Sequence, residues 1–201
     1  MITPIDKWEH IFLDTSVIFD LLANSENLKK NELVKKRVEN TQKLFNYFNE
    51  VTKQTGKKYM FYISAVTISE MTRNDSENMV NAIFYFFNSS GITFVDFSKN
   101  IASKISQNVR EYLPDYSVNQ FISHIQKNTI KPNDIVNIRN WIIDDLKIAA
   151  SAKSIKKLDV VLTADKNTFK PIAEKLKIPV LETNNIPKDL FDEISSIMGI
   201  S

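Results

Sequence analysis

Short runs of apolar and β-branched residues alternate along the chain with longer segments whose apolar positions recur every three or four residues. The short runs predict buried strands, and the longer segments predict helices that pack on a sheet. Chains that alternate strands and helices in this way form a parallel sheet with helices on both faces. The predicted strands span residues 10–13, 59–63, 92–97, 160–163 and 178–181.

Residues typical of helix ends mark several of the predicted helices. Ser16 is placed to cap a helix over 17–22, because its hydroxyl can accept a hydrogen bond from an unpaired backbone N–H. Gly56 stands where a long helical pattern over 27–55 should end. Other predicted helices are one that begins at Ser64 or Thr67, and those over 77–88, 99–113, 118–127, 134–154 (one helix or two) and 168–176.

The chain has no internal repeat, no low-complexity segment and no linker rich in Pro, Gly or Ser. Its 201 residues therefore predict one domain, 1–201, with a three-layer α/β/α fold around a central parallel sheet of about five strands. Two helical stretches, about 24–57 and about 114–140, are interpreted as insertions into that core.

Composition and charge narrow the functional classes. Hydrophobic residues make up 43% of the chain, which is enough for a sizeable core, and the absence of cysteine excludes disulfide scaffolds, cysteine nucleophiles and thiolate zinc sites. The net charge of +2 makes no case for nucleic-acid or membrane binding. The first residues lack the pattern of a signal peptide, and no apolar stretch approaches the roughly 20 residues of a membrane span. We expect a cytoplasmic protein that does not bind membranes.

Four acidic residues suggest the chemistry. Asp14 directly follows the first predicted strand, and Asp165 follows the fourth. In open parallel sheets, ligands bind beyond the carboxyl ends of the strands, where the order of the connections reverses. Glu70 lies on the helix after the second strand. Asp145 shares a helix face with one isoleucine and two alanines, which let that helix approach the sheet closely.

Four carboxylates in one pocket would repel one another, and a divalent cation would neutralise them. Oxygen ligands suit Mg²⁺ or Mn²⁺, which activate water and stabilise phosphoryl displacement. Ser16 and Thr163, each beside one of the acids, are expected to orient a carboxylate or a water. Asp144 points about 100° away from Asp145 around the helix, so we expect it to support the site only indirectly.

Each acid also has a purely structural interpretation. An aspartate after a strand commonly forms a turn or caps a helix. A glutamate on a helix usually faces solvent, and paired aspartates can stabilise a helix start. The functional interpretation therefore depends on all four acids being placed towards one edge of the sheet.

The four segments that carry the acids resemble motifs of the PIN domain family of metal-dependent nucleases. The resemblance implies a PIN-like fold in which Asp14, Glu70, Asp145 and Asp165 bind Mg²⁺ or Mn²⁺ and are the catalytic residues of an endoribonuclease that hydrolyses RNA phosphodiester bonds. Many small members are VapC-like toxins, so it also implies the toxin of a toxin–antitoxin pair, homodimeric and bound by an antitoxin. The matching segments are FLDTSVI at 12–18, SAVTISEM at 64–71, DLKIAASA at 145–152 and LTADKNTF at 162–169.

Other interpretations fit less well. A phosphatase of the haloacid dehalogenase type requires a second aspartate where this chain has Ser16, and a metal-adhesion domain requires a serine where it has Ile18. The two insertions make the chain longer than the compact toxins. This extra length argues against the toxin role more than it argues against nuclease activity. A catalytically silent PIN-like module that binds RNA or docks a protein remains the alternative, although a scaffold has no physical need for four like charges.

Basic residues of the first insertion could hold the nucleic acid. Lys35, Lys36 and Arg37 are expected to contact RNA phosphates if this insertion packs beside the acids. Lysines on an exposed helix more often only keep it solvated, so this prediction depends on their position in the fold.

Overall fold

A single five-stranded sheet forms the centre of the computed structural model, which describes residues 3–23, 31–73, 85, 91–129 and 135–187. All neighbouring strands are parallel, which confirms the predicted α/β fold with a parallel sheet of five strands. The strands are β1 (His10–Leu13), β2 (Met60–Ser64), β3 (Thr93–Val95), β4 (Val160–Thr163) and β5 (Val180–Glu182).

The strand order is β3-β2-β1-β4-β5. The chain therefore builds outwards from β1 through β2 to β3, and then returns to the other side of β1 to add β4 and β5. Backbone pairing brings Leu13 of β1 beside Leu162 of β4. The order of connections thus reverses between β1 and β4, which is where open parallel sheets bind their ligands.

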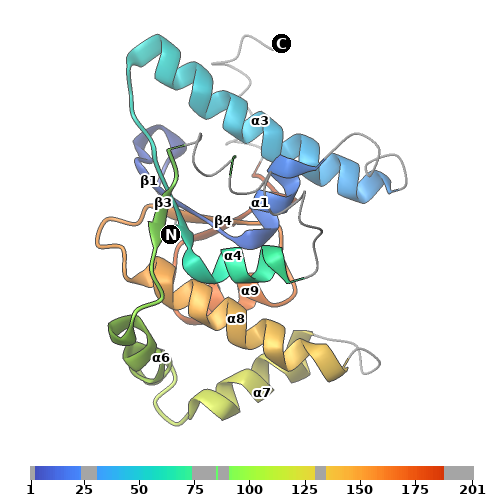
Figure 1. The fold of residues 1–201 in the computed structure, drawn as a ribbon, viewed down its shortest axis with the longest axis vertical. Helices are drawn as coiled ribbons and strands as arrows, with labels where there is room; N and C mark the ends of the chain where they lie inside the picture. The colour runs from blue at the N-terminus through green and yellow to red at the C-terminus, as the bar shows by residue number, and fades with distance from the viewer. Residues whose placement is uncertain (1–2, 24–30, 74–84, 86–90, 130–134, 188–201) are drawn as a thin grey trace.

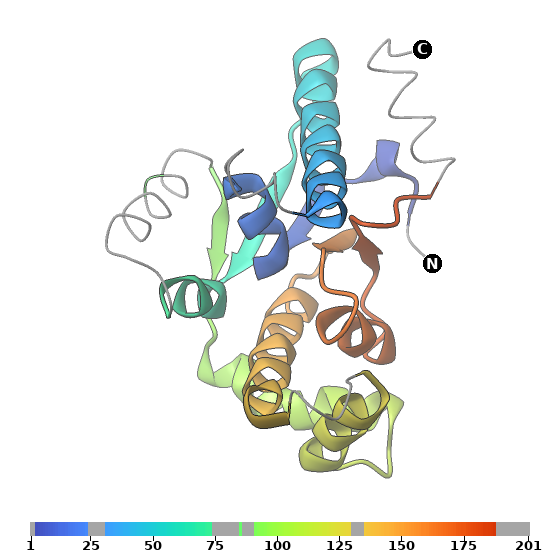
Figure 2. The same cartoon turned by 90° about the vertical axis from the view of Figure 1, so that its right-hand side faces the viewer.

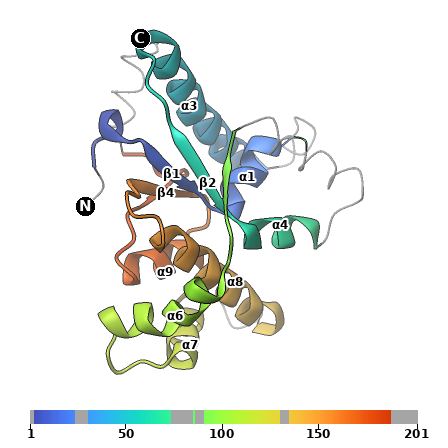
Figure 3. The same ribbon diagram turned by 60° about the vertical axis from the view of Figure 1, so that its left-hand side comes forward.

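Helices cover both faces of the sheet (Figures 1 and 2). One face is covered by α1 (Thr15–Leu22) and α3 (Glu32–Thr55), and the other by α6 (Lys99–Tyr112), α7 (Val118–Thr129), α8 (Ile135–Lys153) and α9 (Phe169–Lys175). A short helix, α4 (Ala65–Thr72), follows the end of β2 and contacts both α1 and α8 (Figure 3). A 3₁₀ turn, Ile5–Lys7, precedes β1.

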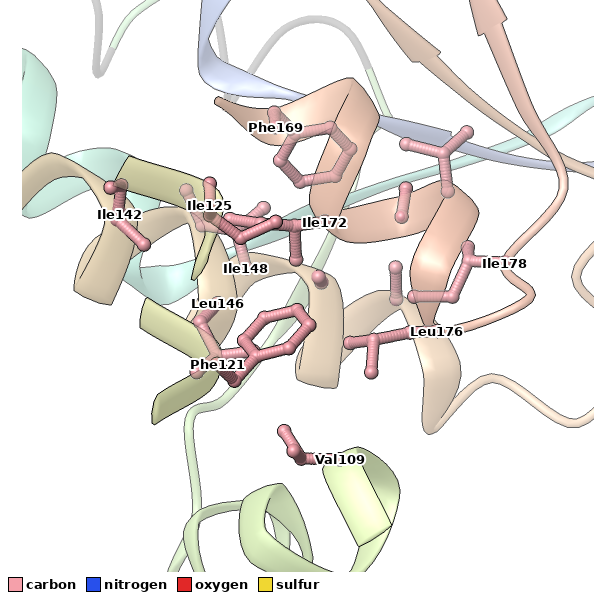
Figure 4. Packing of buried hydrophobic residues seen from close by; sticks show 14 of the residues in the cluster. Val109, Phe121, Ile125, Ile142, Leu146, Ile148, Phe169, Ile172, Leu176 and Ile178 are labelled. Atoms are coloured by element: carbon pink, nitrogen blue, oxygen red, sulfur yellow. The ribbon is translucent and has the colours of Figure 1, made fainter. Parts of the chain in front are cut away.

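The side chains of the strands alternate between two buried clusters. Ile11 and Leu13 pack with α1 and α3, whereas Phe12 packs on the opposite face with α8 and α9. This period of two is what a strand with both faces covered requires. In the second cluster, Phe121 of α7 packs with Leu146 of α8 and with Ile172 of α9 (Figure 4). The helices of the predicted second insertion thus add to the main core.

Most predicted boundaries agree with the structure to within a few residues, and one predicted cap is wrong. Helix α1 begins at Thr15 with Asp14 in the N-cap position, so Ser16 lies inside the first turn. Its hydroxyl is hydrogen-bonded to Asp14 and to the backbone of Ala164 instead of capping the helix. Gly56 ends α3 in the left-handed conformation, with φ of 72°, as predicted.

Further differences concern single elements. The last strand begins two residues later than predicted, because Lys177, with φ of 54°, and Ile178 still close the turn after α9. The segment 134–154 contains one helix rather than two. Ser64 caps α4 by accepting a hydrogen bond from the N–H of Val66. The predicted helix over 77–88 lies outside the described residues, apart from residue 85.

Within the described part of the chain, no helix combines the length and the hydropathy that a membrane span requires.

Candidate acidic site at the carboxyl ends of β1 and β4

Asp14 lies at the point where the sheet reverses its order and is only 2% exposed. Its Oδ2 accepts hydrogen bonds from the hydroxyls of Ser16, at 2.5 Å, and Thr163, at 2.8 Å. Each of these hydroxyls accepts a backbone N–H in turn: Ser16 from Ala164, at 2.8 Å, and Thr163 from Asp165, at 2.9 Å. The two hydroxyls therefore join the end of β1 to the loop after β4.

Asp165 stands in that loop and is bonded to the turn that begins α9. Its Oδ1 accepts from the N–H groups of Asn167, at 2.7 Å, and Thr168, at 3.1 Å. Its Oδ2 accepts from the Thr168 hydroxyl and, at 3.4 Å, from the N–H of Phe169. In this arrangement Asp165 orders the turn that precedes α9, which is a role that an aspartate after a strand commonly has.

Glu70 reaches the same edge from α4. Its Oε2 accepts a hydrogen bond of 2.5 Å from the hydroxyl of Thr15, the residue next to Asp14. The Thr15 hydroxyl is also hydrogen-bonded to that of Thr67, one turn before Glu70 on α4, at 3.1 Å. Burial raises the pKa of Glu70 to about 7, with further contributions from the charges of Asp14 and Asp144.

Asp145 comes from α8 and is 7% exposed. Its neighbours on the same helix face, Ile148, Ala149 and Ala152, are fully buried, so the helix lies close to the sheet as its alanines predicted. The Oδ2 atom of Asp145 is buried and has no hydrogen-bond partner among the described residues. Burial raises the pKa of Asp145 well above its usual range, and the charges of Asp14, Asp165 and Glu70 raise it further.

Asp144 points elsewhere, as its position on the helix predicted. Its carboxylate forms ion pairs with Arg73 and with Lys147, each at 2.8 Å. Arg73 follows α4, so this pair joins α4 to α8, and the Arg73 charge also favours the ionised form of Glu70. Asp144 is thus linked to the acids through Arg73.

The electrostatic interactions show that the four predicted acids lie within range of one another. Burial raises the pKa of Asp14 to about 6, the Ser16 hydrogen bond opposes this, and the charge of Asp165 adds to it. The charges of Asp14, Asp165 and Glu70 raise the pKa of Asp145. The structure therefore brings Asp14, Glu70, Asp145 and Asp165 together in one cluster, although the chain supplies them from four separate segments.

Comparison with known proteins gives one distant structural similarity and no match by sequence. No protein-family model matches the chain, and no curated protein does. Among solved structures, the chain is similar to that of VapBC2 from Rickettsia felis bound to a DNA fragment from their promoter. The two are 16% identical, with a TM-score of 0.45, over 86% of this chain and 98% of that one.

The cluster fits a divalent cation by its chemistry. None of the ion pairs formed by the described residues involves the four acids. The unpartnered Oδ2 of Asp145 is an oxygen that a hard cation can bind. In their present orientations, however, no three His, Asp or Glu side chains of the described ranges are arranged to hold a metal ion. Asp14, Glu70 and Asp165 are instead turned towards hydroxyl and amide donors, and would have to exchange some of these for the ion.

Several residues of the site were not among the predicted ones. Thr15 donates a hydrogen bond to Glu70 and is itself hydrogen-bonded to Thr67. Thr168 is hydrogen-bonded to both Asp165 and Asp145, and Arg73 forms an ion pair with Asp144. Thr15, Thr67 and Thr168 stand within the quoted motifs, so their hydroxyls were visible in the sequence. The contacts of Arg73 and Thr67 arise only from folding.

The predicted basic residues lie on α3, on the opposite face of the sheet from α8 (Figure 1). Lys35 and Lys36 are exposed. Arg37 forms an ion pair of 2.7 Å with the buried carboxylate of Asp20 on α1. Its guanidinium therefore has a structural role that the sequence did not reveal.

Proposed function

We propose that this protein is a metal-dependent endoribonuclease of the PIN type, in which Asp14, Glu70, Asp145 and Asp165 bind Mg²⁺ or Mn²⁺. One observation supports the proposal: four carboxylates interact electrostatically near the topological switch point of the sheet, and none of them has a paired cation among the described residues. Mutual repulsion and burial make this cluster costly for folding alone. The similarity of the four segments to PIN motifs gives the reaction class.

The residues of the chain have separate roles in this proposal. The four carboxylates neutralise the ion, and the hydroxyls of Ser16 and Thr163 fix the orientation of Asp14. Thr15 orients Glu70 in the same way. Asp144 is a positioning residue, because its pair with Arg73 joins α8 to the end of α4. When bound, Mg²⁺ or Mn²⁺ would activate water and stabilise the charge that develops on the phosphate.

Cleavage of single-stranded RNA in the presence of Mn²⁺ tests the proposal. We expect the wild-type protein to cleave, the addition of chelator to stop cleavage, and Asp14→Asn to lower the rate by about 10²–10³-fold, the loss typical of removing one electrostatic group from an active site. Asp115→Asn, which changes an exposed acid between α6 and α7, is the matched control and should retain full activity. Cleavage that survives both chelator and Asp14→Asn would overturn the assignment.

A catalytically silent PIN-like module is the second candidate, and the hydrogen bonds of Asp165 favour it. Both oxygens of that residue accept hydrogen bonds from the turn that leads into α9, which is the arrangement of a structural turn-forming aspartate. If the purified protein binds RNA or a protein but does not cleave RNA with Mg²⁺ or Mn²⁺, this second function is correct.

The PIN resemblance also extends the proposal to a toxin of a toxin–antitoxin pair, acting as a homodimer with RNA as substrate and an antitoxin protein as partner. Expression of the chain should then arrest growth, and co-expression of a small protein encoded beside it should relieve the arrest. Growth arrest by wild type but not by Asp14→Asn would connect toxicity to the acidic site. If expression leaves growth unchanged, an RNA-processing role replaces the toxin role.

A further inference from the structure

Trp141 is an exposed aromatic residue on the helix that carries Asp145. It precedes Asp145 by four residues, which places it about 6 Å further along α8 and only about 40° away around the helix axis. Ile148 and Ala152 lie on the same side of the helix and are fully buried, whereas Trp141 is 52% exposed. The indole thus lies on the same face of α8 as these buried residues, but the hydrophobic core does not cover it.

The position of α8 against the sheet explains this exposure. The hydroxyl of Ser151 is 3.1 Å from that of Ser64, the last residue of β2, so Ser151 is level with the carboxyl edge of the sheet. Residues that precede Ser151 on α8 extend beyond that edge, with Asp145 about 9 Å and Trp141 about 15 Å along the helix from Ser151. The sheet that covers Ala152 therefore ends before it reaches Trp141.

Two basic groups are paired with an acidic residue one turn after Trp141 on α8. Asp144, three residues after Trp141, pairs with Arg73 and Lys147, whose side chains are 46% and 34% exposed. This part of α8 thus carries an exposed indole and, one turn later, an aspartate that is paired with two partly exposed cations. Proteins that bind single-stranded nucleic acid commonly combine a π-face with positive charge in this way.

We propose that the Trp141 indole stacks on an unpaired base of a single-stranded nucleic acid whose neighbouring phosphate lies at the acids. The inference rests on the proposed nuclease function for the identity of the strand. Stacking on an indole is tolerant of base identity, because every base has a π-face, but it requires that the base be unpaired. Trp141 would thereby select single-stranded over double-stranded substrate, and Arg73 would contact the backbone.

The second tryptophan makes the proposal testable by fluorescence. Trp8 is fully buried, and its indole N–H donates to the carbonyl of Thr3 at 2.7 Å. A base that stacks on an exposed indole should quench Trp141 and leave Trp8 unchanged. Fluorescence that changes on binding in the wild type and not in Trp141→Phe therefore reports the stacking contact itself.

In the experiment, an eight-nucleotide oligoadenylate RNA is titrated into the full chain in the presence of Mg²⁺. All proteins carry Asp14→Asn, so that the oligonucleotide stays intact. We expect quenching, and weakening of binding by about 5- to 150-fold in Trp141→Ala, which is the range for loss of one stacked base. Trp141→Phe should retain most of the affinity without the quenching. Met60→Ala, an exposed apolar residue at the amino end of β2, is the matched control and should bind as the parent does.

Two further arms distinguish stacking from other causes. An abasic ribose-phosphate chain of the same length and an RNA duplex should both bind without quenching, because neither presents an unpaired base. Equal quenching by the abasic chain would overturn the inference, as would unchanged affinity in Trp141→Ala. If that unchanged affinity accompanies metal-dependent cleavage by the wild type, the nuclease proposal stands and the base contact is wrong. If quenching occurs without cleavage, the contact is correct and the protein is the silent module.

Discussion

Asp20 and Asp145 are both buried aspartates, but their surroundings are opposite. Asp20 of α1 is fully buried. It accepts a bifurcated hydrogen bond from the single Nε–H of Arg37, at 2.9 and 3.1 Å to its two oxygens, and one from Thr41, at 3.2 Å. Burial raises the pKa of Asp20, and the hydrogen bond and charge of Arg37 oppose that rise. Asp145 has an unpartnered oxygen and three other acids within electrostatic range.

The difference distinguishes a carboxylate that is paired within the protein from one that we propose binds a metal ion. Where this protein buries a carboxylate to join two helices, it supplies a cation and a hydroxyl, as buried charges generally require. At the carboxyl edge of the sheet it supplies hydroxyls for Asp14 and Glu70 but no paired cation among the described residues. The missing positive charge is what the proposed dication would provide.

Substitutions at the Asp20–Arg37 pair and at Asp145 should therefore change the free energy of unfolding in opposite directions. Arg37→Met leaves Asp20 buried without its counter-charge, and we expect the free energy of unfolding to fall by about 3 kcal/mol, near the lower end for a broken buried pair because Arg37 is partly exposed. Asp145→Asn removes a desolvated and repelled charge, so it should raise the stability of the chelated protein. Urea unfolding at pH 7.5 with chelator measures both changes.

Lys36→Met is the control for Arg37→Met, because Lys36 is the exposed neighbour on the same helix and should change stability by about 0.5 kcal/mol or less. A destabilised Asp145→Asn protein would contradict the comparison, since it would mean that contacts such as the Thr168 hydroxyl outweigh the burial and repulsion of the Asp145 charge.

The pH dependence of stability should differ between the metal-free and metal-bound protein. The pKa values of Asp14 and Glu70 are raised by burial from 3.8 to about 6 and from 4.5 to about 7. Between about pH 4 and pH 7 the folded state therefore binds more protons than the unfolded state, so stability falls as pH rises through this window. We expect a loss on the order of 4 kcal/mol between pH 5 and pH 8 with chelator.

Thermal unfolding with chelator and with Mn²⁺ checks this prediction. Because the ion binds the deprotonated carboxylates, its stabilising effect should be larger at pH 8 than at pH 5. A metal effect of equal size at both pH values would mean that the ion binds away from these acids. Asp14→Asn should reduce both the pH dependence and the metal effect.

The sequence predicted the strands well because a strand buried on both faces leaves an uninterrupted apolar run. β1 and β4 have the predicted bounds, and both are followed by one of the acids. The face of α8 was predictable because Asp145 is spaced one or two turns from residues that only a buried helix would keep apolar. Asp144 and Asp145 could be distinguished by that spacing alone.

Pairwise contacts could not be predicted in the same way, because they depend on how distant segments meet. Ser16 looked like a helix cap, yet its hydroxyl bonds to the loop after β4, which is distant in sequence. Arg37 looked like part of a basic patch, yet it pairs with Asp20. In both cases local spacing indicated a residue suited to polar contacts, and only tertiary structure determined the partner.

The smallest effect that we expect is on the rate of cleavage when one of the two hydroxyls that donate to Asp14 is removed. Ser16→Ala removes one hydrogen bond to Asp14 Oδ2 and the acceptor of the Ala164 N–H, but leaves Thr163 in place. We expect Mn²⁺-dependent cleavage to fall about tenfold, the lower end for residues that orient a metal ligand, with a higher Mn²⁺ concentration needed for half-maximal rate. Ser103→Ala, an exposed serine of α6, is the control and should change neither. A lower rate with an unchanged Mn²⁺ requirement would place Ser16 outside the metal site, because a residue that orients Asp14 must alter how strongly that carboxylate binds the ion.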